Sequence, residues 1–327
     1  MSVNKTIVIT GAAGFIASCL VSKLNELGYG EQLILVDDFS VKAKEANFAA
    51  KKFGLKIHRD DFFEYLDKNA SEISFVFHIG ARTDTTLQNV DIFDSLNLNY
   101  SKKVWKLCSK HRIPMIYASS AATYGAGEHG YQDNNEEISL LKPLNPYGQS
   151  KQDFDVWALA ESESPPFWAG FKFFNVYGPN EYHKGRMASV IFHAFNQIKA
   201  SGTMKLFRSH RADFTDGGQS RDFVYVKDLI DVLIHFYENQ QHSGIYNLGS
   251  GKARSFLDLV KGVFHAMQTE ANIGFIDTPE DIRETYQYFT EADLSNLRKA
   301  GYSKEFTELE SGIEDYVKNY LVDSVYC

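Results

Sequence analysis

Short apolar runs alternate with stretches of helical spacing through the first half of the chain. The runs are rich in β-branched and aromatic residues, which favour buried strands. Between them apolar positions recur every three or four residues, as in 19–27, and a helix is expected to begin near Tyr147. The predicted strands are 6–10, 32–36, one that ends before Arg59, 74–78, 113–118 and 171–174. Strands that alternate with helices in this way predict an α/β fold with a doubly wound parallel sheet.

A glycine turn joins the first predicted strand to the first helix. Its sequence, Gly11-Ala-Ala-Gly14-Phe-Ile-Ala17, differs in spacing from the usual G-x-G-x-x-G, and Ala17 stands where a third glycine would allow close packing. Such a turn lets the backbone approach a pyrophosphate, which then lies at the positive end of the helix. Its position directly after a strand predicts a dinucleotide-binding Rossmann domain.

The end of the second predicted strand bears on the choice of dinucleotide. Asp37 and Asp38 lie about 20 residues beyond the turn, where an acidic residue commonly accepts hydrogen bonds from the adenine ribose. Asp37 alone would indicate NAD, whereas Lys42, Lys44 and Arg59 could neutralise the 2′-phosphate of NADP. The residues therefore favour NADP and leave NAD open.

Candidate chemistry lies at the fifth predicted strand and the helix after it. Tyr147 and Lys151 are four residues apart and so share one helix face. A neighbouring ammonium stabilises a phenolate and brings the pKa of the tyrosine towards the working range of a base. Ser119 and Ser120 follow a buried strand, where open α/β sheets bind their ligands. A serine hydroxyl there could hold a substrate oxygen while Tyr147 takes its proton.

Past residue 174 the pattern changes. A polar, loop-like run over 180–186 precedes a predicted helix over 187–200, and 208–220 has the composition of an exposed loop. Strands are predicted at 221–226 and 244–249, followed by a mixed C-terminal third with a short polar segment at 285–290. Because no linker separates the halves, we expect interleaved domains. The predicted division is 1–174 and 222–248 for cofactor binding, with 175–221 and 249–327 as a smaller substrate-binding domain.

Composition narrows the class of protein. The 327 residues carry 34 basic and 42 acidic side chains, a net charge of −8 that disfavours nucleic acid or an anionic membrane as a general partner. The three cysteines, Cys19, Cys108 and Cys327, are scattered, so neither a disulfide framework nor a metal site is expected. No signal segment and no long apolar stretch is apparent, which predicts a cytoplasmic protein.

Several motifs together resemble those of one family. The glycine turn, the Ser119-Ser120 pair, Tyr147-x-x-x-Lys151 and Arg221-Asp-Phe-Val-Tyr-Val are similar to those of the extended short-chain dehydrogenase/reductases that act on nucleotide sugars. The segments 117–125, 174–179, 183–190 and 286–294 resemble the branch of that family that epimerises ADP-heptose at C6. His183-Lys-Gly-x-Met-Ala-Ser-Val190 is the most specific of them. The resemblance covers essentially the whole chain.

The resemblance implies an isomerase that inverts C6 of ADP-heptose with tightly bound NADP, in the supply of lipopolysaccharide core heptose. It also implies a homo-oligomer, often a pentamer. Tyr147 and Lys184 would be the two acid/base groups, supported by Lys151 and Ser120. The expected substrate contacts are Ser120, Asn175, Lys184, Arg186, His193, Phe207, Arg208, Arg221 and Tyr286. The expected cofactor contacts are Gly11, Gly14, Phe15, Ile16, Asp37, Asp38, Lys44, Arg59, Ile79, Gly80, Ala81, Asn97, Lys151 and Val176.

Two alternatives and three departures accompany this interpretation. A regulatory protein could keep the fold and bind NADP without catalysis. A nucleotide-sugar dehydratase would use a carboxylate pair beside the serine, where this chain has Ala121 and Ala122. The departures from the family pattern are Arg186 in place of a small residue, the Arg82-Thr83 loop and the long 208–220 segment. These departures concern the contacts with phosphate and the loop expected to cover the site. They leave the predicted acid/base residues unchanged.

Overall fold

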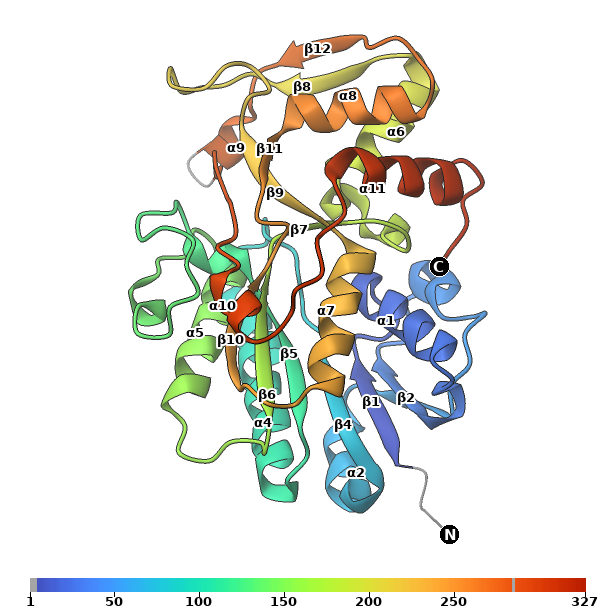
Figure 1. The fold of residues 1–327 in the computed structure, drawn as a ribbon, viewed down its shortest axis with the longest axis vertical. Helices are drawn as coiled ribbons and strands as arrows, with labels where there is room; N and C mark the ends of the chain where they lie inside the picture. Colours follow the sequence, from blue (N-terminus) through green and yellow to red (C-terminus); the bar gives the residue numbers. More distant parts are fainter. Residues whose placement is uncertain (1–4, 284–285) are drawn as a thin grey trace.

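A parallel sheet forms the centre of the molecule (Figure 1). In the computed structural model, which describes residues 5–283 and 286–327, seven strands pair in the order β10-β6-β5-β4-β1-β2-β3, and every pairing is parallel. The strands are β1 (Thr6–Thr10), β2 (Leu33–Asp37), β3 (Leu55–His58), β4 (Ile73–His78), β5 (Met115–Ser120), β6 (Trp168–Phe173) and β10 (Gly244–Leu248). The predicted doubly wound α/β fold is confirmed. From β1 the chain adds strands towards one edge of the sheet, and from β4 it adds them towards the other. Sheets of this kind bind ligands at the carboxyl ends of the strands beside this switch point.

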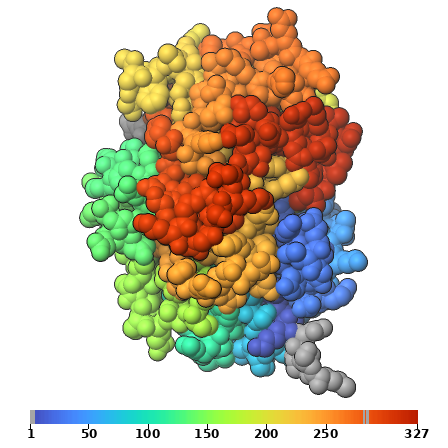
Figure 2. All heavy atoms as spheres, in the orientation of Figure 1, coloured from blue at the N-terminus to red at the C-terminus, as the bar shows by residue number. Residues whose placement is uncertain are grey.

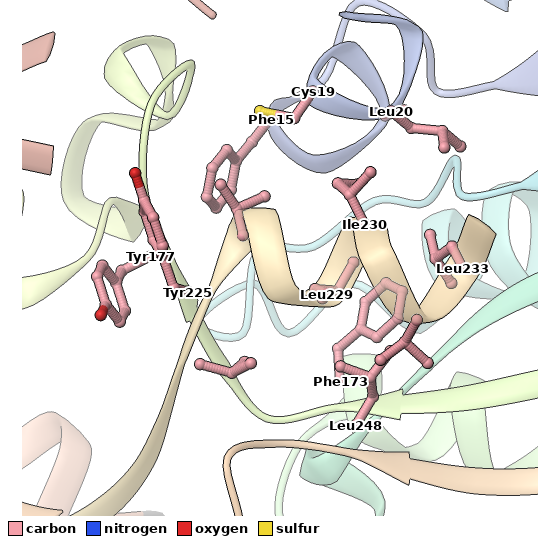
Figure 3. Packing of buried hydrophobic residues seen from close by; sticks show 14 of the residues in the cluster. Phe15, Cys19, Leu20, Phe173, Tyr177, Tyr225, Leu229, Ile230, Leu233 and Leu248 are labelled. Atoms are coloured by element: carbon pink, nitrogen blue, oxygen red, sulfur yellow. The ribbon is translucent and has the colours of Figure 1, made fainter. Parts of the chain in front are cut away.

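Helices cover both faces of this sheet. On one face lie α1 (Phe15–Glu26) and α7 (Val226–Glu238); on the other lie α2 (Phe62–Asn69), α4 (Tyr100–His111) and α5 (Pro146–Ala160). Successive residues of a strand point to opposite faces, so Ile9 packs with the first core and Val8 with the second. Figure 3 shows the first core, where Leu20 of α1 lies near Ile230 and Leu233 of α7. The sheet whose carboxyl edge carries the candidate site is thus packed on both faces by a hydrophobic core.

Two smaller sheets lie beyond that edge. In the described residues β7 (Asn175–Tyr177), β9 (Ser220–Tyr225) and β11 (Ala253–Ser255) form one, and β8 (Met204–Phe207) with β12 (Ile273–Ile276) forms the other. They pack with α6 (Val190–Ser201), α8 (Phe256–Ala266) and α11 (Leu309–Tyr316), at the top of Figures 1 and 2. The remaining α-helices of the described residues are the short α3 (Val90–Phe93), α9 (Glu280–Arg283) and α10 (Ser295–Lys299). Residues 222–225, which the predicted division assigns to the cofactor-binding domain, belong instead to the smaller three-stranded sheet. The division into two domains itself remains a prediction.

Several element boundaries differ from the sequence prediction. The first helix begins at Phe15 rather than Cys19, because it starts directly at the glycine turn. The fifth strand runs to Ser120 instead of ending at residue 118, so both serines are part of the strand. Part of the expected loop over 180–186 is a 3₁₀ helix, Tyr182–Met187, and the following helix begins at Val190. Of the polar segment 285–290, Thr285 lies outside the described residues. None of the helices in the described ranges is long and apolar enough to cross a membrane.

Candidate active site

The glycine turn brings two backbone segments into close contact. Gly11 has a φ of 69°, and a Cβ on it would lie 2.5 Å from the Cα of Gly80, in the loop after β4. A side chain at either glycine would therefore collide with backbone. Gly14 precedes the first residue of helix α1, and no side chain caps the first N–H groups of the helix. Such free N–H groups suit an anion. The turn thus fits the pyrophosphate of a dinucleotide.

The carboxylate of Asp37 is already engaged within the chain. It is buried and accepts hydrogen bonds from the backbone N–H groups of Ala13 at 3.0 Å and Asp38 at 2.7 Å, while Lys44 Nζ lies 3.2 Å away. Arg59 lies 3.7 Å from Asp38. Asp37 therefore shapes the turn rather than presenting free oxygens to a ribose, and one cation lies beside each of the two aspartates.

The loop after β4 is fastened to helix α5 through Asn97. This buried amide accepts from the backbone N–H of Arg82 at 2.8 Å, donates to its carbonyl at 3.0 Å and donates to Ser150 Oγ at 3.0 Å. Ile79, Gly80 and Ala81 therefore lie at the carboxyl edge of the sheet, beside Gly11. Asn97 acts by holding this loop.

The two adjacent serines at the end of β5 have different partners. Ser119 Oγ donates to the buried carboxylate of Asp155 at 2.6 Å. Ser120 Oγ accepts from the backbone N–H of Ala122 at 3.1 Å, and its hydrogen bond with Tyr147 favours the phenolate. Successive side chains of a strand face opposite ways, and of the two serines it is Ser120 whose hydrogen bond lowers the pKa of Tyr147.

Helix α5 positions Tyr147 and Lys151 as the spacing predicts. Asn145 caps the helix by accepting from the N–H of Gly148 at 2.8 Å, and Pro146 occupies its first turn. Burial raises the pKa of Tyr147, and the hydrogen bond with Ser120 opposes that rise. Burial lowers the pKa of Lys151 to about 8, and its Nζ donates to the Ala118 carbonyl at 2.8 Å. Within the described residues Lys151 thus has no carboxylate in hydrogen-bonding contact.

Lys184 comes to the cofactor turn from a different segment. Its Nζ lies 5.2 Å from the centre of the Phe15 ring, at the start of α1. Burial lowers the pKa of Lys184, and the neighbouring Glu181 opposes this shift. Glu181 is itself buried and fixes the segment by accepting from Ser189 N at 2.5 Å and Ser189 Oγ at 2.6 Å. A partly desolvated lysine therefore lies near the glycine turn.

Asn47 and His183 link this lysine segment to the turn, and sequence reasoning missed both contacts. The Asn47 amide is buried and donates to the Ala13 carbonyl at 2.9 Å, and it lies 3.2 Å from His183 Nδ1. Burial, together with Lys44 and Lys184, lowers the pKa of His183 to about 4, so the imidazole is neutral at pH 7. A neutral ring next to Lys184 accepts the amide hydrogen without adding a competing charge.

Arg221 is a buried cation on strand β9. Its guanidinium stacks near Tyr286 and Phe256, at 5.4 and 5.7 Å from the ring centres, and burial lowers its pKa. The neighbouring Asp222 does not pair with it, because its carboxylate accepts from the N–H groups of Ser250, Gly251 and Ala292. Among the described residues no carboxylate pairs with Arg221. Its Nη1 donates to the Ser220 carbonyl at 3.0 Å, and its charge remains without a counterion.

The other predicted substrate residues are only partly brought together. Phe207 packs edge-on against Tyr286, with ring centres 6.3 Å apart, next to Arg221. Arg208 is exposed and pairs with Asp277 at 3.2 Å, which competes with a phosphate role. Three more candidates occupy separate positions: Asn175 is exposed on β7, Arg186 is exposed on the 3₁₀ helix, and His193 lies on α6. Val176, a predicted cofactor contact, is half-buried on β7.

Comparison with known proteins agrees with this arrangement. Residues 7–249 match the NAD dependent epimerase/dehydratase family. A protein of Fusobacterium nucleatum named ADP-L-glycero-D-manno-heptose-6-epimerase is 47% identical over 325 residues, which cover 96% of this chain and 98% of that protein. The chain belongs to the NAD dependent epimerase/dehydratase family. A relative with the same name from Nitratidesulfovibrio vulgaris is 46% identical over 316 residues, with 96% and 97% of the two chains covered.

Solved structures of the family share the fold. The crystal structure of ADP-L-glycero-D-manno-heptose-6-epimerase from Helicobacter pylori superimposes with a TM-score of 0.82 at 27% identity, over 98% of this chain and 97% of that one. A UDP-N-acetylglucosamine 4-epimerase from Methanobrevibacter ruminantium gives 0.80 at 23% identity, over 98% and 99%. The second likeness concerns the fold alone. Family membership establishes a nucleotide-sugar epimerase fold with an NAD(P) site.

In this member of the family a buried ion pair underlies the serine strand, and sequence reasoning missed it. Lys172 Nζ lies 2.7 Å from Asp155 Oδ2, and both side chains are fully buried. Asp155 also accepts from Tyr117 at 3.1 Å, and Lys172 donates to Thr123 at 2.8 Å. The available signal was the helical spacing, because Asp155 follows Lys151 by four residues. Its partner on β6 could be found only from the fold.

Proposed function

We propose that this chain is an ADP-heptose 6-epimerase, which interconverts ADP-D-glycero-β-D-manno-heptose and ADP-L-glycero-β-D-manno-heptose through a 6-keto intermediate. One structural observation carries the proposal. Two half-buried groups that can transfer protons, Tyr147 and Lys184, approach the cofactor edge from separate segments. Two such groups suit an enzyme that inverts a carbon, because each can serve one face, whereas a simple dehydrogenase uses only one. Relatives bearing this activity in their names, at 46% and 47% identity, support it.

The cofactor proposed for this site is NADP, which when bound accepts the C6 hydride and returns it to the other face. Gly11, Gly14 and Gly80 give the pyrophosphate access to backbone N–H groups. Lys44 and Arg59 would hold the 2′-phosphate, since both lie beside acidic residues that they could leave for a more strongly charged partner. NAD remains the alternative, and the Lys44 experiment below distinguishes the two.

The Ser120–Tyr147 pair serves one face of C6. The Ser120 hydroxyl holds the substrate oxygen while the Tyr147 phenolate takes its proton, and Lys151 stabilises the phenolate by its charge. Because Lys151 has no carboxylate in hydrogen-bonding contact in the described structure, its field acts on the site undiminished by a direct ion pair.

Lys184 serves the other face. Its lowered pKa makes proton exchange near neutral pH easier than for an exposed lysine. The Asn47–His183 contact keeps the lysine segment against the glycine turn. Rotation of the planar keto sugar between the two groups would then allow hydride to return to the opposite face.

The ADP moiety lies, in this proposal, between the two smaller sheets and the main sheet. Arg221 would bind the diphosphate with its unpaired fork, and Tyr286 with Phe207 would pack against the nucleoside. Asn175, His193, Arg186 and Arg208 remain proposed contacts. The homo-oligomeric state, the cytoplasmic location and the role in lipopolysaccharide heptose supply are also proposals that follow from the resemblance.

Two measurements test the function. First, denaturing the purified protein and identifying the released nucleotide should yield NADP. Second, incubating the native protein with ADP-D-glycero-β-D-manno-heptose should produce the L-glycero epimer, followed by proton NMR of the heptose. NADP release without any change of the sugar would favour the non-catalytic binding protein, and loss of water from the sugar would indicate a dehydratase.

The choice of cofactor is tested by Lys44→Ala. Losing a charge-assisted contact to phosphate should weaken NADP binding by about 1.5 to 3 kcal/mol and leave NAD binding nearly unchanged. The matched control is Lys42→Ala, because Lys42 is exposed on the same 3₁₀ segment. Equal weakening of both dinucleotides, measured by fluorescence titration, would contradict the assignment.

A further inference from the structure

Cys19 and Cys327 lie side by side although 308 positions separate them in the sequence. Their sulfur atoms are 3.1 Å apart, within hydrogen-bonding distance. Cys19 is 6% exposed on α1, where Figure 3 shows its sulfur near Phe15, whereas Cys327 is partly exposed. In Figures 1 and 2 the red C-terminal segment reaches the blue N-terminal part of the chain. A small reagent can therefore reach Cys327 first.

The surroundings connect this thiol pair to the segment that carries Lys184. Asn180 is fully buried with a φ of 75°; it accepts from the Cys327 backbone N–H at 3.0 Å and donates to its Sγ at 3.2 Å. Two residues later, Tyr182 donates to the Val325 carbonyl at 2.8 Å and packs edge-on against Tyr326. The last residues thus hold residues 180–184 against α1.

The two thiols differ in reactivity. The hydrogen bond with Cys19, and then Lys51 and Ser22, lower the pKa of Cys327 against the effect of burial. Burial raises the pKa of Cys19. Since the thiolate is the nucleophile in thiol–disulfide exchange, Cys327 is the attacking thiol and Cys19 the resolving one.

We propose that Cys19 and Cys327 form a redox-responsive thiol pair, whose oxidant is a low-molecular-weight disulfide and whose product is an intramolecular disulfide that fastens residues 180–184 to α1. The Cys327 thiolate attacks the small disulfide, giving a mixed disulfide and one released thiolate. Cys19 then loses its proton and attacks the Cys327 sulfur, which releases the second small thiol. The protein loses two hydrogen atoms, and the small disulfide is reduced to two thiols.

Geometry favours this outcome over a lasting adduct. A disulfide needs its sulfurs about 2.0 Å apart, so the pair has to move by only about 1 Å. A bulky adduct on Cys327 would instead displace Asn180 from its two contacts with that residue. The cross-link closes a long loop and so restricts the unfolded chain, which should raise the Tm by roughly 5 °C or more. The inference does not depend on the proposed sugar substrate.

The experiment treats the purified full chain with oxidised glutathione after removal of reductant. Intact mass, free thiols, peptide mapping and Tm are measured before and after, and then again with added dithiothreitol. Variants Cys19→Ser, Cys327→Ser and Cys108→Ser are treated in parallel. Cys108→Ser is the matched control, because Cys108 is fully buried in the other core and takes no part in the pair.

The expected results distinguish each step. The wild type should lose two of its three thiols without gaining the mass of glutathione, its linked peptides should contain Cys19 and Cys327, and dithiothreitol should reverse the change and the rise in Tm. Cys19→Ser should stop at the glutathione adduct on Cys327, and Cys327→Ser should react at least about tenfold more slowly. Hydrogen exchange of residues 180–184 should slow in the oxidised wild type and not in treated Cys19→Ser.

A stable glutathione adduct on the wild type, or a linked peptide that contains Cys108, would overturn the proposal. So would equal rates for wild type and Cys327→Ser. The peptide map of the wild type needs no variant, so the proposal stays testable even if a serine variant fails to fold.

Discussion

Two groups of polar residues lie where the carboxyl end of β5 packs against α5: a lower group around Asp155 and an upper group around Tyr147. In the lower group Asp155 and Lys172 form a fully buried ion pair, and Ser119 donates to the same carboxylate. In the upper group Ser120 and Tyr147 are joined by a hydrogen bond, while Lys151 bonds only to the Ala118 carbonyl. The two charges of the lower group thus neutralise each other, whereas Lys151 in the upper group has no carboxylate in hydrogen-bonding contact among the described residues.

The difference shows how one strand can serve both stability and chemistry. A buried charge is tolerated when it is paired, and its removal leaves the partner stranded at a large cost. A buried charge without a counterion instead shifts its pKa, as for Lys151, and becomes able to act on a ligand. We therefore expect changes in the lower group to alter the free energy of unfolding, and changes in the upper group to alter the rate.

The largest effects are expected for the two proton-transfer groups. Tyr147→Phe and Lys184→Met should each reduce the epimerisation kcat by about a hundredfold to ten-thousandfold, because each removes the acid/base group for one face of C6. The bound NADP and the Tm should change little. Epimer formation by NMR, nucleotide content and circular dichroism are the measurements.

Lys199→Met is the control for Lys184→Met, since Lys199 is exposed at the end of α6. It should retain wild-type activity. If Lys184→Met also retained near wild-type epimerisation, the two-group scheme would be wrong, and Tyr147 would have to transfer both protons.

The lower group should respond in stability. Asp155→Asn leaves Lys172 charged and fully buried without a counterion, so the free energy of unfolding should fall by about 3 to 5 kcal/mol. Urea unfolding measures this loss. Asp153→Asn, a partly exposed site on the same helix, should change the free energy by less than about 0.5 kcal/mol. Equal stability of the two variants would remove the distinction between the groups.

The free energy of unfolding should depend on pH through Lys151 of the upper group. Burial lowers its pKa from 10.5 to about 8 in the folded state, so between these values the unfolded chain binds more protons. Stability should therefore rise with pH from about 8 to 10.5, by about 3 kcal/mol in total. Lys151→Met should abolish this rise relative to wild type and be more stable than wild type below pH 8. Parallel curves for the two proteins would show that Lys151 is not desolvated in the folded state.

Local spacing explains what could be predicted from the sequence. The glycine turn and the Tyr147–Lys151 face depend on residues within one turn or one helix, and the structure places them as expected. The alternation of strands and helices likewise predicted the doubly wound sheet. These features need no knowledge of which distant segments meet.

The remaining contacts depend on tertiary structure. Ser119 and Ser120 are neighbours in sequence, but only the strand boundary shows that they face different ways. The pairing of Asp155 with Lys172 joins a helix to a neighbouring strand, and Asn47 reaches His183 across 136 positions. The composition of these segments carries no signal for such pairs, since each side chain alone suggests a surface residue.

The smallest effect is expected for Arg221, another buried cation that no described carboxylate pairs with. Arg221→Lys keeps the charge but loses the planar fork, so the KM for the ADP-sugar should rise about tenfold while kcat changes little. Arg254→Lys is the matched control, because Arg254 lies opposite Arg221 on β11 and pairs with Glu310 at the surface. It should leave KM unchanged. Steady-state kinetics over a range of ADP-heptose concentrations separate the two parameters. Unchanged kinetics for Arg221→Lys would mean that this cation, like Lys172, serves the fold, stabilised there by the rings of Tyr286 and Phe256 instead of by a carboxylate.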